Sequence, residues 1–172
     1  VGFMEKEVKV RFLNKETNYS KYLEEALSFD TNDSWLFDDE IDNDVIWSLE
    51  DKRFSSFTYG LFLEDKLIGL MMVDFTDNEE QNLVFETSII IHPEYRKCGM
   101  GNFLLQSVIQ ELQAKSKLIS SLHATIYADN IPSQQLVLKN GFVFQKEGTM
   151  NNKLIYMYQC NLKEINKEKK MS

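Results

Sequence analysis

A short polar loop near the middle of the chain has the residue types needed to hold an anion. Arg96 and Lys97 are adjacent cations, and Gly99 and Gly101 follow them just before an apolar, helix-forming stretch. The first N–H groups of a helix have no partner within the helix, and the helix dipole adds about half a positive charge at that end. Because glycine has no Cβ, the backbone can turn tightly and approach a ligand. The loop is therefore suited to a pyrophosphate group.

Two other interpretations of this loop follow from its residues alone. Gly-x-Gly is a weak signal, and both glycines could serve only the packing of a strand-to-helix turn. A dinucleotide-binding fingerprint needs a third glycine, and that position holds Leu104. The fingerprint also normally follows the first parallel strand of a chain, whereas this loop follows a later one. The dinucleotide interpretation is therefore disfavoured, and the packing interpretation stays open.

The elements that position the loop follow from the spacing of apolar residues. The run Leu83–Ile91 is too continuously apolar for a half-exposed strand, which indicates a strand buried in the middle of a sheet. Residues 76–82 are polar and end the preceding strand. The full pattern predicts strands over residues 8–13, 56–63, 66–75, 83–91, 118–128, 141–144 and 153–161, and helices over residues 15–29, 41–51, 103–112 and 132–139.

This order of elements predicts a mixed sheet. A strand-loop-helix-strand unit in the middle of the chain should pair residues 83–91 in parallel with residues 118–128. An open sheet of this kind binds its ligand at the carboxyl ends of the parallel strands. The loop at Arg96 lies at that end.

The loop and a later segment together resemble a known family. Arg96-x-x-Gly99-x-Gly101, preceded by Ile-Ile-Ile-His-Pro-Glu-Tyr and followed by an amphipathic helix, resembles the acyl-CoA-binding motif of the GNAT superfamily of N-acyltransferases. A second motif, Asn130-x-x-Ser133-x-x-Leu136 with Gly-Phe at 141–142, resembles the later motif of that family. Two motifs in the right order on the right elements are more specific than either alone.

The resemblance implies a fold for most of the chain, over residues 8–162. We expect an α/β (α+β) domain with a mixed central sheet of about seven strands, helices on both faces, and a splay between the fourth and fifth strands. Residues 1–172 should form a single N-acetyltransferase domain, with flexible ends at residues 1–5 and 163–172.

The resemblance also implies acetyl-CoA (coenzyme A) as co-substrate. Backbone amides of residues 98–101, with Arg96 and Lys97 nearby, would hold the pyrophosphate. The backbone of residues 89–91 would pair with the pantetheine arm, and Asn130 and Ser133 would contact the pantetheine or thiol end. The implied coenzyme-binding residues are Ile89, Ile90, Ile91, Arg96, Lys97, Cys98, Gly99, Met100, Gly101, Asn130 and Ser133.

Glu86 is the leading candidate for the catalytic base. An amine must be neutral to attack a thioester, and Glu86 is the carboxylate on the central strand nearest the expected cleft. It could act directly or through a water, provided that burial raises its proton affinity toward the working pH. The alternative is that Glu86 is a strand residue facing solvent or a structural partner.

The proton donor to the leaving thiolate is harder to assign. The family often places a tyrosine seven residues after the motif asparagine, and here that position is Val137. Tyr127, Tyr156, Tyr158, Ser133 or a water could replace it.

Other reactive residue types in the chain favour structural interpretations. His92 and His123 have no second ligand at a metal-binding spacing, so no metal site is expected. Cys98 occupies a variable position of the motif, and direct transfer needs no acyl-cysteine. Cys98 and Cys160 lie too far apart in sequence to suggest a zinc or paired-thiol motif, which favours a reducing, cytoplasmic location.

The charge balance excludes several classes of partner. The chain has 172 residues, with 27 acids against 19 Lys and Arg, a net charge of −8 and a pI of about 4.8. Such a field repels phosphate backbones and anionic membranes, so we expect no nucleic-acid or membrane partner. We also expect no signal peptide, and no window approaches the roughly 20 apolar residues of a membrane span.

One acidic segment bears on the acceptor. Residues 24–51 contain 11 acids and no Lys or Arg, interleaved with Trp35, Phe37 and Trp47. In the family that this chain resembles, the corresponding helices and their connecting loop commonly line the acceptor side of the cleft. Acids and aromatic residues there would suit a cationic amine. The alternative is a solvated acidic face whose aromatic residues pack inward.

The expected function is direct transfer of an acetyl group from acetyl-CoA to a primary amine, with a small cationic amine as acceptor, by an enzyme that is a monomer or a homodimer. Two alternatives remain. One is acetylation of a protein or peptide N-terminus or lysine, and the other is a catalytically silent CoA-binding module, which Val137 suggests.

Overall fold

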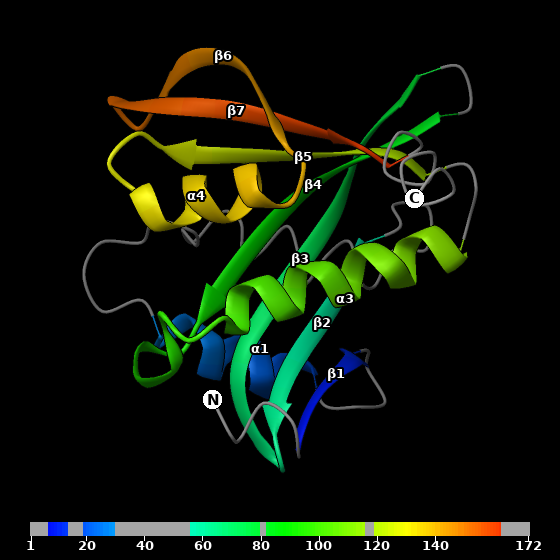
Figure 1. Ribbon diagram of the computed structural model, residues 1–172, viewed down its shortest axis with the longest axis vertical. Helices are drawn as coiled ribbons and strands as arrows, with labels where there is room; N and C mark the ends of the chain where they lie inside the picture. Colours follow the sequence, from blue (N-terminus) through cyan, green and yellow to red (C-terminus); the bar gives the residue numbers. More distant parts are fainter. Residues whose placement is uncertain (1–6, 14–18, 30–55, 80–81, 116–118, 163–172) are drawn as a thin grey trace. The chain divides into compact units, whose positions relative to one another are not determined.

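The computed structural model describes residues 7–13, 19–29, 56–79, 82–115 and 119–162 (Figure 1). Its strands are β1 (Val8–Leu13), β2 (Ser56–Leu63), β3 (Lys66–Glu79), β4 (Asn82–Ile91), β5 (Ile119–Tyr127), β6 (Val143–Met150) and β7 (Lys153–Asn161). Its helices are α1 (Tyr19–Leu27), α3 (Met100–Lys115) and α4 (Ile131–Lys139), with a 3₁₀ turn, η3, over Pro93–Tyr95.

The strands form one mixed sheet. Its seven strands follow the order β1-β2-β3-β4-β5-β7-β6. The β4–β5 pair is parallel, whereas β1–β2, β2–β3, β5–β7 and β6–β7 are antiparallel. The structure therefore confirms the predicted α+β class and the predicted parallel pair.

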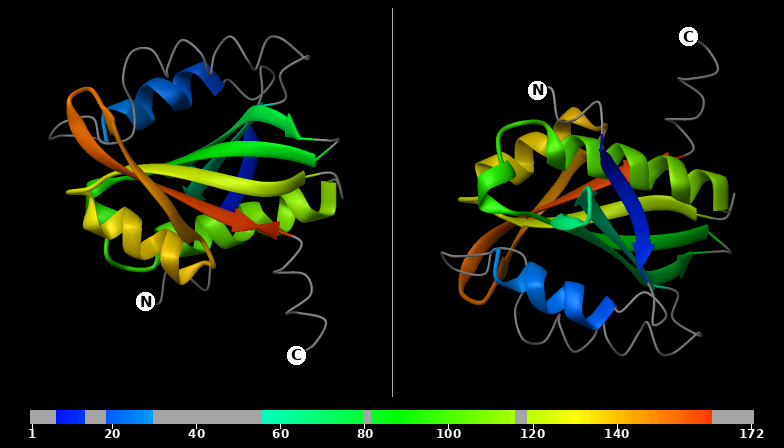
Figure 2. Two further views of the ribbon diagram at one scale, coloured as in Figure 1. Left: turned by 90° about the horizontal axis from the view of Figure 1, so that it is seen from above. Right: turned by 90° about the horizontal axis from the view of Figure 1, so that it is seen from below.

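The described residues divide into two compact units. The first lies within residues 1–74 and 88–108, and the second within residues 75–87 and 109–172. In the first unit, α1 and the first part of α3 cover opposite faces of strands β2 and β3 (Figure 2). The core beneath α1 consists of Leu13, Leu23, Ala26, Phe29, Phe62, Leu67, Leu70, Met72 and Ile90.

Helix α1 is held to this core by one apolar face. Leu23 and Ala26 are buried, and Leu27 lies four residues after Leu23 on the same side of the helix. Tyr22 places its ring edge-on to Phe62 at a centroid distance of 5.1 Å. The chain leaves this helix through Phe29, whose ring is also buried.

The second unit contains the β5–β7–β6 part of the sheet, with α4 along one face of β5 and β7 (Figure 1). The hydroxyl of Tyr158 on β7 donates a hydrogen bond to Gln134 Oε1 on α4 at 3.2 Å. Met150 pairs with Lys153 at the end of the β6–β7 hairpin, so its turn consists of Asn151 and Asn152. Their φ angles of 52° and 60° are left-handed, which a two-residue hairpin turn requires and asparagine tolerates well.

Two predicted boundaries need comment. The polar residues 76–79 were expected to end a strand, but β3 continues to Glu79, so that prediction is wrong. Ladder hydrogen bonds use the backbone, and polar residues can therefore extend a strand past the apolar part of its sequence. The helix predicted over residues 41–51 and the flexible ends at 1–5 and 163–172 lie outside the described residues. None of the described helices is long and apolar enough to cross a membrane.

Candidate active site

The chain leaves β4 through a turn that His92 organises. His92 donates its backbone N–H to the Ile68 carbonyl at 2.8 Å, and its Nδ1 accepts the N–H of Glu94 at 3.1 Å. This cap starts η3, where Pro93 stands at a position that needs no N–H donor. The ring also contacts Tyr95 edge-on at 5.5 Å. His92 therefore has a local structural role in these contacts.

The next residues form the loop predicted to hold pyrophosphate. Lys97 and Gly99 have left-handed φ angles of 62° and 83°, and α3 begins at Met100. Turns with left-handed residues bring successive N–H groups into a concavity that binds anions. The first N–H groups of α3, from Met100 onward, have no carbonyl partner within the helix. The backbone of this loop thus offers several donors at a helix N-terminus.

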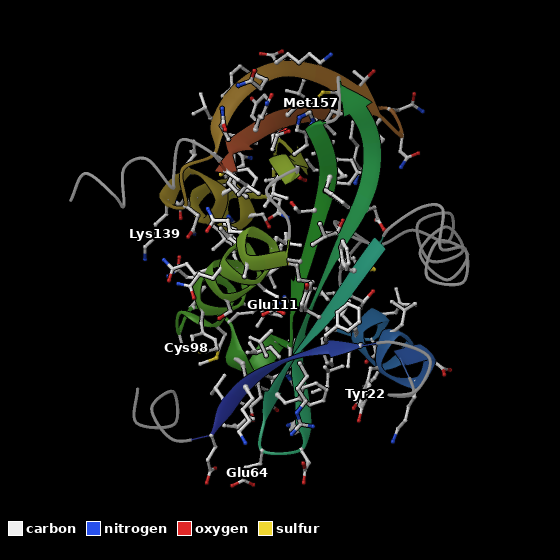
Figure 3. The ribbon with its side chains drawn as sticks, turned by 90° about the vertical axis from the view of Figure 1, so that its right-hand side faces the viewer. Tyr22, Glu64, Cys98, Glu111, Lys139 and Met157 are labelled. Atoms are coloured by element: carbon white, nitrogen blue, oxygen red, sulfur yellow. The ribbon has the colours of Figure 1, made fainter. Side chains whose placement is uncertain are left out.

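The left-handed conformation at Lys97 has a cost. A residue with a Cβ loses roughly 1–2 kcal/mol in this region, because Cβ approaches the following carbonyl. Such strain is found at ligand-binding positions, where the surrounding structure maintains it. Here Cys98 contributes to that support, since its thiol donates to the Tyr95 carbonyl at 2.8 Å. The side chain of Cys98 is labelled in Figure 3.

The Arg96 side chain forms hydrogen bonds with carbonyl groups outside the loop. Its Nε donates to the Ile91 carbonyl at 2.9 Å, and one Nη donates to the Phe29 carbonyl at 2.8 Å. The sequence suggested only that Arg96 stands near a phosphate, and no local pattern pointed to Phe29. Two of the five guanidinium donors are used in this way.

The end of β4 carries the residues predicted to pair with pantetheine. Ile90 is buried, whereas Ile89 and Ile91 are half-buried. The Ile91 side chain extends over Gly69, where an added Cβ would stand only 2.8 Å from Ile91 Cδ1. Glycine at 69 is therefore needed for Ile91 to keep its place.

Glu86 stands in the second unit, at the last residue of the parallel ladder. The β4–β5 register runs from Leu83–Ile119 to Glu86–His123. There, Glu86 Oε1 accepts the backbone N–H of Thr125 at 2.8 Å, and Thr87 Oγ1 donates to the His123 carbonyl at 2.9 Å. Side chains of β4 thus bond to the β5 backbone where the ladder stops. The sequence analysis missed Thr87 and Thr125, for which the sequence carries no signal.

Asn130 and Ser133 meet at the start of α4. Asn130 is buried, and its Oδ1 accepts the Ser133 N–H at 3.3 Å, so that Asn130 caps the helix. Gln134, which the sequence analysis did not single out, donates from Nε2 to the Ala128 and Tyr127 carbonyls at 2.8 and 3.3 Å. These bonds tie α4 to the end of β5.

The candidate proton donors differ in their hydrogen bonding. Tyr158 donates its O–H to Gln134, and burial raises its pKa above the ordinary value, with a further contribution from neighbouring Tyr156. Tyr127 instead accepts a hydrogen bond from Asn151 Nδ2 at 3.0 Å. Val137, at the family's tyrosine position, is buried.

The described residues contain no cluster of His, Cys, Asp and Glu that could hold a metal ion. The structure groups Ile89–Ile91 with the loop at 96–101 in the first unit. It places Glu86 beside Thr125, and Asn130 beside Ser133, in the second.

Comparison with known proteins decides the family of this chain. The model of the acetyltransferase (GNAT) family matches residues 20–142, which is more than half of the sequence. The chain belongs to the GNAT family of acetyltransferases. It is accordingly an acetyl-CoA-dependent acyltransferase, as the two motifs predicted. A search of curated proteins found no match.

Solved GNAT structures share this fold at low sequence identity. A GNAT acetyltransferase from Streptococcus pneumoniae is 20% identical with a TM-score of 0.67, over 90% of this chain and 99% of that one. The yncA protein of Salmonella typhimurium, solved with its cofactor acetyl-CoA, is 19% identical with a TM-score of 0.64, over 90% and 94%. A Salmonella typhimurium enzyme that modifies the N-terminal serine of ribosomal protein L7/L12 is 15% identical with a TM-score of 0.66, over 91% and 95%.

Proposed function

We propose that this GNAT enzyme transfers an acetyl group from acetyl-CoA directly to a primary amine, and that its preferred acceptor is a small cationic amine. The observation that carries the coenzyme part is the loop at residues 96–101. It has left-handed residues at Lys97 and Gly99 and leads directly into the N-terminus of α3, where the first N–H groups have no partner within the helix.

The coenzyme's pyrophosphate would accept hydrogen bonds from the amides of residues 98–101. Lys97 is exposed and adds a positive charge to the same loop. The backbone of Ile89, Ile90 and Ile91 would pair with the pantetheine arm. Asn130 and Ser133 would contact the pantetheine or thiol end, from the cap at which α4 begins. Within the described residues, Arg96 uses two of its five guanidinium donors, for the carbonyls of Ile91 and Phe29.

Glu86 would take the proton of the attacking amine. Its Oε1 accepts the Thr125 N–H, which fixes the direction of the carboxylate. A carboxylate oxygen carries more than one lone pair, so an ordered water or the amine itself can still donate to this group. The amine nitrogen then bonds to the thioester carbon, the C–S bond breaks, and the thiolate takes a proton.

Tyr127 is the tyrosine best placed by its hydrogen bonding to supply that proton. Its hydroxyl accepts from Asn151 and donates to no other residue within the described part of the chain, whereas the O–H of Tyr158 is donated to Gln134. The raised pKa of Tyr158 also makes it a weaker acid. Tyr156, Ser133 and water remain the other candidates.

The acidic segment at residues 24–51 supports the cationic acceptor. Eleven acids without a Lys or Arg repel one another, and a bound polyamine or aminoglycoside would relieve that repulsion. Of this segment, only residues 24–29 lie within the described part of the chain, where Glu24 and Glu25 are exposed on α1. The similarity to an enzyme acting on the N-terminal serine of L7/L12 makes a peptide N-terminus the second candidate.

A thiol-release assay with acetyl-CoA tests these proposals. Polyamines, aminoglycosides, amino acids and peptides would be compared at equal concentration, and we expect the highest kcat/KM with a polycationic small amine. Highest turnover of a peptide N-terminus would replace the acceptor proposal with the second candidate. Coenzyme A binding without turnover of any acceptor would favour the catalytically silent alternative.

A further inference from the structure

The parallel ladder between β4 and β5 ends before either strand does. Its last pair is Glu86 with His123, and both strands continue beyond it. The next β4 residue, Thr87, would lie opposite Ala124. In a parallel ladder, a bonded residue uses its N–H and C=O on the two residues that flank its partner. The next backbone rung would therefore join Thr87 to the His123 carbonyl and to the Thr125 N–H.

Two side chains make these bonds in place of the Thr87 backbone. Thr87 Oγ1 donates to the His123 carbonyl at 2.9 Å. Glu86 Oε1 accepts the Thr125 N–H at 2.8 Å. A hydroxyl thus replaces a backbone donor, and a carboxylate replaces a backbone acceptor. We call these two bonds the side-chain rung, and all four of its residues belong to the second unit.

The side-chain rung holds the two backbones farther apart than a ladder would. Strands joined by backbone hydrogen bonds lie about 4.8 Å apart, and a bond made through a side chain adds the length of that side chain. The rung also gives partners to two part-buried groups on β5, which would be costly to leave without hydrogen bonds. The separation of β4 from β5 can therefore begin at Thr87 with the His123 carbonyl and the Thr125 N–H both paired.

Thr87 is the member of the rung that can prevent a further backbone rung. Its β-branched side chain is restricted to few rotamers, so the hydroxyl is held on the His123 carbonyl at little entropic cost. Without that hydroxyl the carbonyl would need another donor, and the register offers the Thr87 N–H. That new bond would bring the Thr87 carbonyl to the Thr125 N–H, where it would displace Glu86 Oε1.

We propose that Thr87 is a positioning residue for the acetyl transfer. Its hydroxyl stops the β4–β5 ladder from closing by one further rung and so keeps the Glu86 carboxylate on the Thr125 N–H. The inference rests on the proposed role of Glu86 as the base, because a carboxylate released from this bond loses its fixed direction. A misplacement of about 1 Å at a reacting group can cost roughly 100-fold in rate.

The Thr125 amide reports on the side-chain rung without knowledge of the acceptor. In the wild type, its NMR resonance should shift when Glu86 takes up a proton at low pH, and Glu86→Gln should abolish that part of the shift. Any contribution from neighbouring His123 is common to both proteins. Thr87→Val keeps the shape of the side chain but removes the hydroxyl, so the Glu86-dependent shift should be lost. Thr87→Ser keeps the hydroxyl and should retain the shift.

Kinetics test the consequence, with an acceptor from the thiol-release screen. We expect the kcat of Thr87→Val to fall roughly tenfold, with the Kd of coenzyme A within about twofold of the wild type. Thr87→Ser should restore most of the activity, since it supplies the same donor. Thr58→Val is the matched control, because Thr58 is buried on β2 and its hydroxyl has no hydrogen-bond partner among the described residues. The control should keep the wild-type kcat.

The outcomes separate this inference from the proposed function. Full activity of Glu86→Gln, or absence of acetyl transfer by the wild type, would overturn the proposed function and the inference with it. If Glu86→Gln is inactive, a Thr87→Val enzyme with the wild-type kcat or an unchanged Thr125 titration would overturn the role of Thr87 alone. If Thr87→Val fails to fold, Thr87→Ala removes the same hydroxyl and carries the same comparisons.

Discussion

The backbone N–H of Thr125 donates to Glu86 Oε1 at 2.8 Å, two residues beyond His123, which is the β5 residue of the last pair between β4 and β5. A side chain of one strand thus takes the place of a main-chain acceptor at the end of the parallel ladder. The same carboxylate is the proposed base, so its structural and chemical roles have to be separated by choosing the right substitution.

Glu86→Gln should separate them, because glutamine keeps an acceptor oxygen for Thr125 but cannot take a proton. We expect kcat to fall roughly 100-fold or more, as for loss of a general base, with the Kd of coenzyme A nearly unchanged. Glu86→Ala should in addition lower the free energy of unfolding by about 1–3 kcal/mol, because the Thr125 N–H loses its partner. Steady-state kinetics and urea unfolding measure the two effects. A Glu86→Gln enzyme with full activity at every pH would make Glu86 purely structural.

Gly99→Val should weaken coenzyme A binding by at least about tenfold, because a β-branched residue at φ 83° is strained and would shift the backbone of the proposed pyrophosphate loop. Gly141→Val is the matched control, since Gly141 has a similar φ of 86° in the turn after α4. The control should lose a comparable amount of stability and keep its coenzyme affinity. Calorimetric titration measures the coenzyme A affinity of each variant. If folded Gly99→Val binds coenzyme A as tightly as the wild type, the loop is not part of the coenzyme site.

The raised pKa of Tyr158 predicts a loss of stability in alkali. The unfolded chain releases the phenol proton near pH 10 and the folded protein holds it to higher pH, so the unfolded state binds fewer protons and the free energy of unfolding falls as pH rises above about 10. Tyr158→Phe removes this contribution and also the bond to Gln134, which costs about 1 kcal/mol. The stability difference between wild type and Tyr158→Phe, from urea midpoints, should therefore shrink between pH 8 and pH 11. A constant difference would show that Tyr158 titrates normally.

The KM of the acceptor amine should depend on ionic strength and on the charges of the acidic segment. Exposed charges interact only within about 8–10 Å at physiological salt, so the KM of a cationic amine should rise with ionic strength. Neutralising Asp38, Asp39 and Glu40 together should raise it further, with a smaller effect on the acetyl-CoA constant. These residues lie outside the described part of the chain, and the prediction rests on their sequence alone. A neutral or anionic best acceptor would contradict it.

Local features of the site were predictable from the sequence because their causes are local. The left-handed turn at Gly99, the helix beginning at Met100 and the Asn130 cap each depend on residues within a few positions of one another. The order of strands followed from apolar periodicity, which reports which side of each element is buried. The polar end of β3 was missed, because its backbone pairing leaves no mark on side-chain polarity.

The partners of the charged side chains were decided only by the tertiary structure. Glu86 and Thr125 are 39 residues apart, and Arg96 and Phe29 are 67 apart. In each pair one partner is a main-chain group, which every residue type carries, so residue identity cannot reveal it. Packing brings such a group within 3 Å of the side chain, and packing depends on the whole fold. The sequence therefore determined which chemistry the chain carries, and the tertiary structure decided that Arg96 reaches the Phe29 carbonyl and that Glu86 bonds to the backbone of β5.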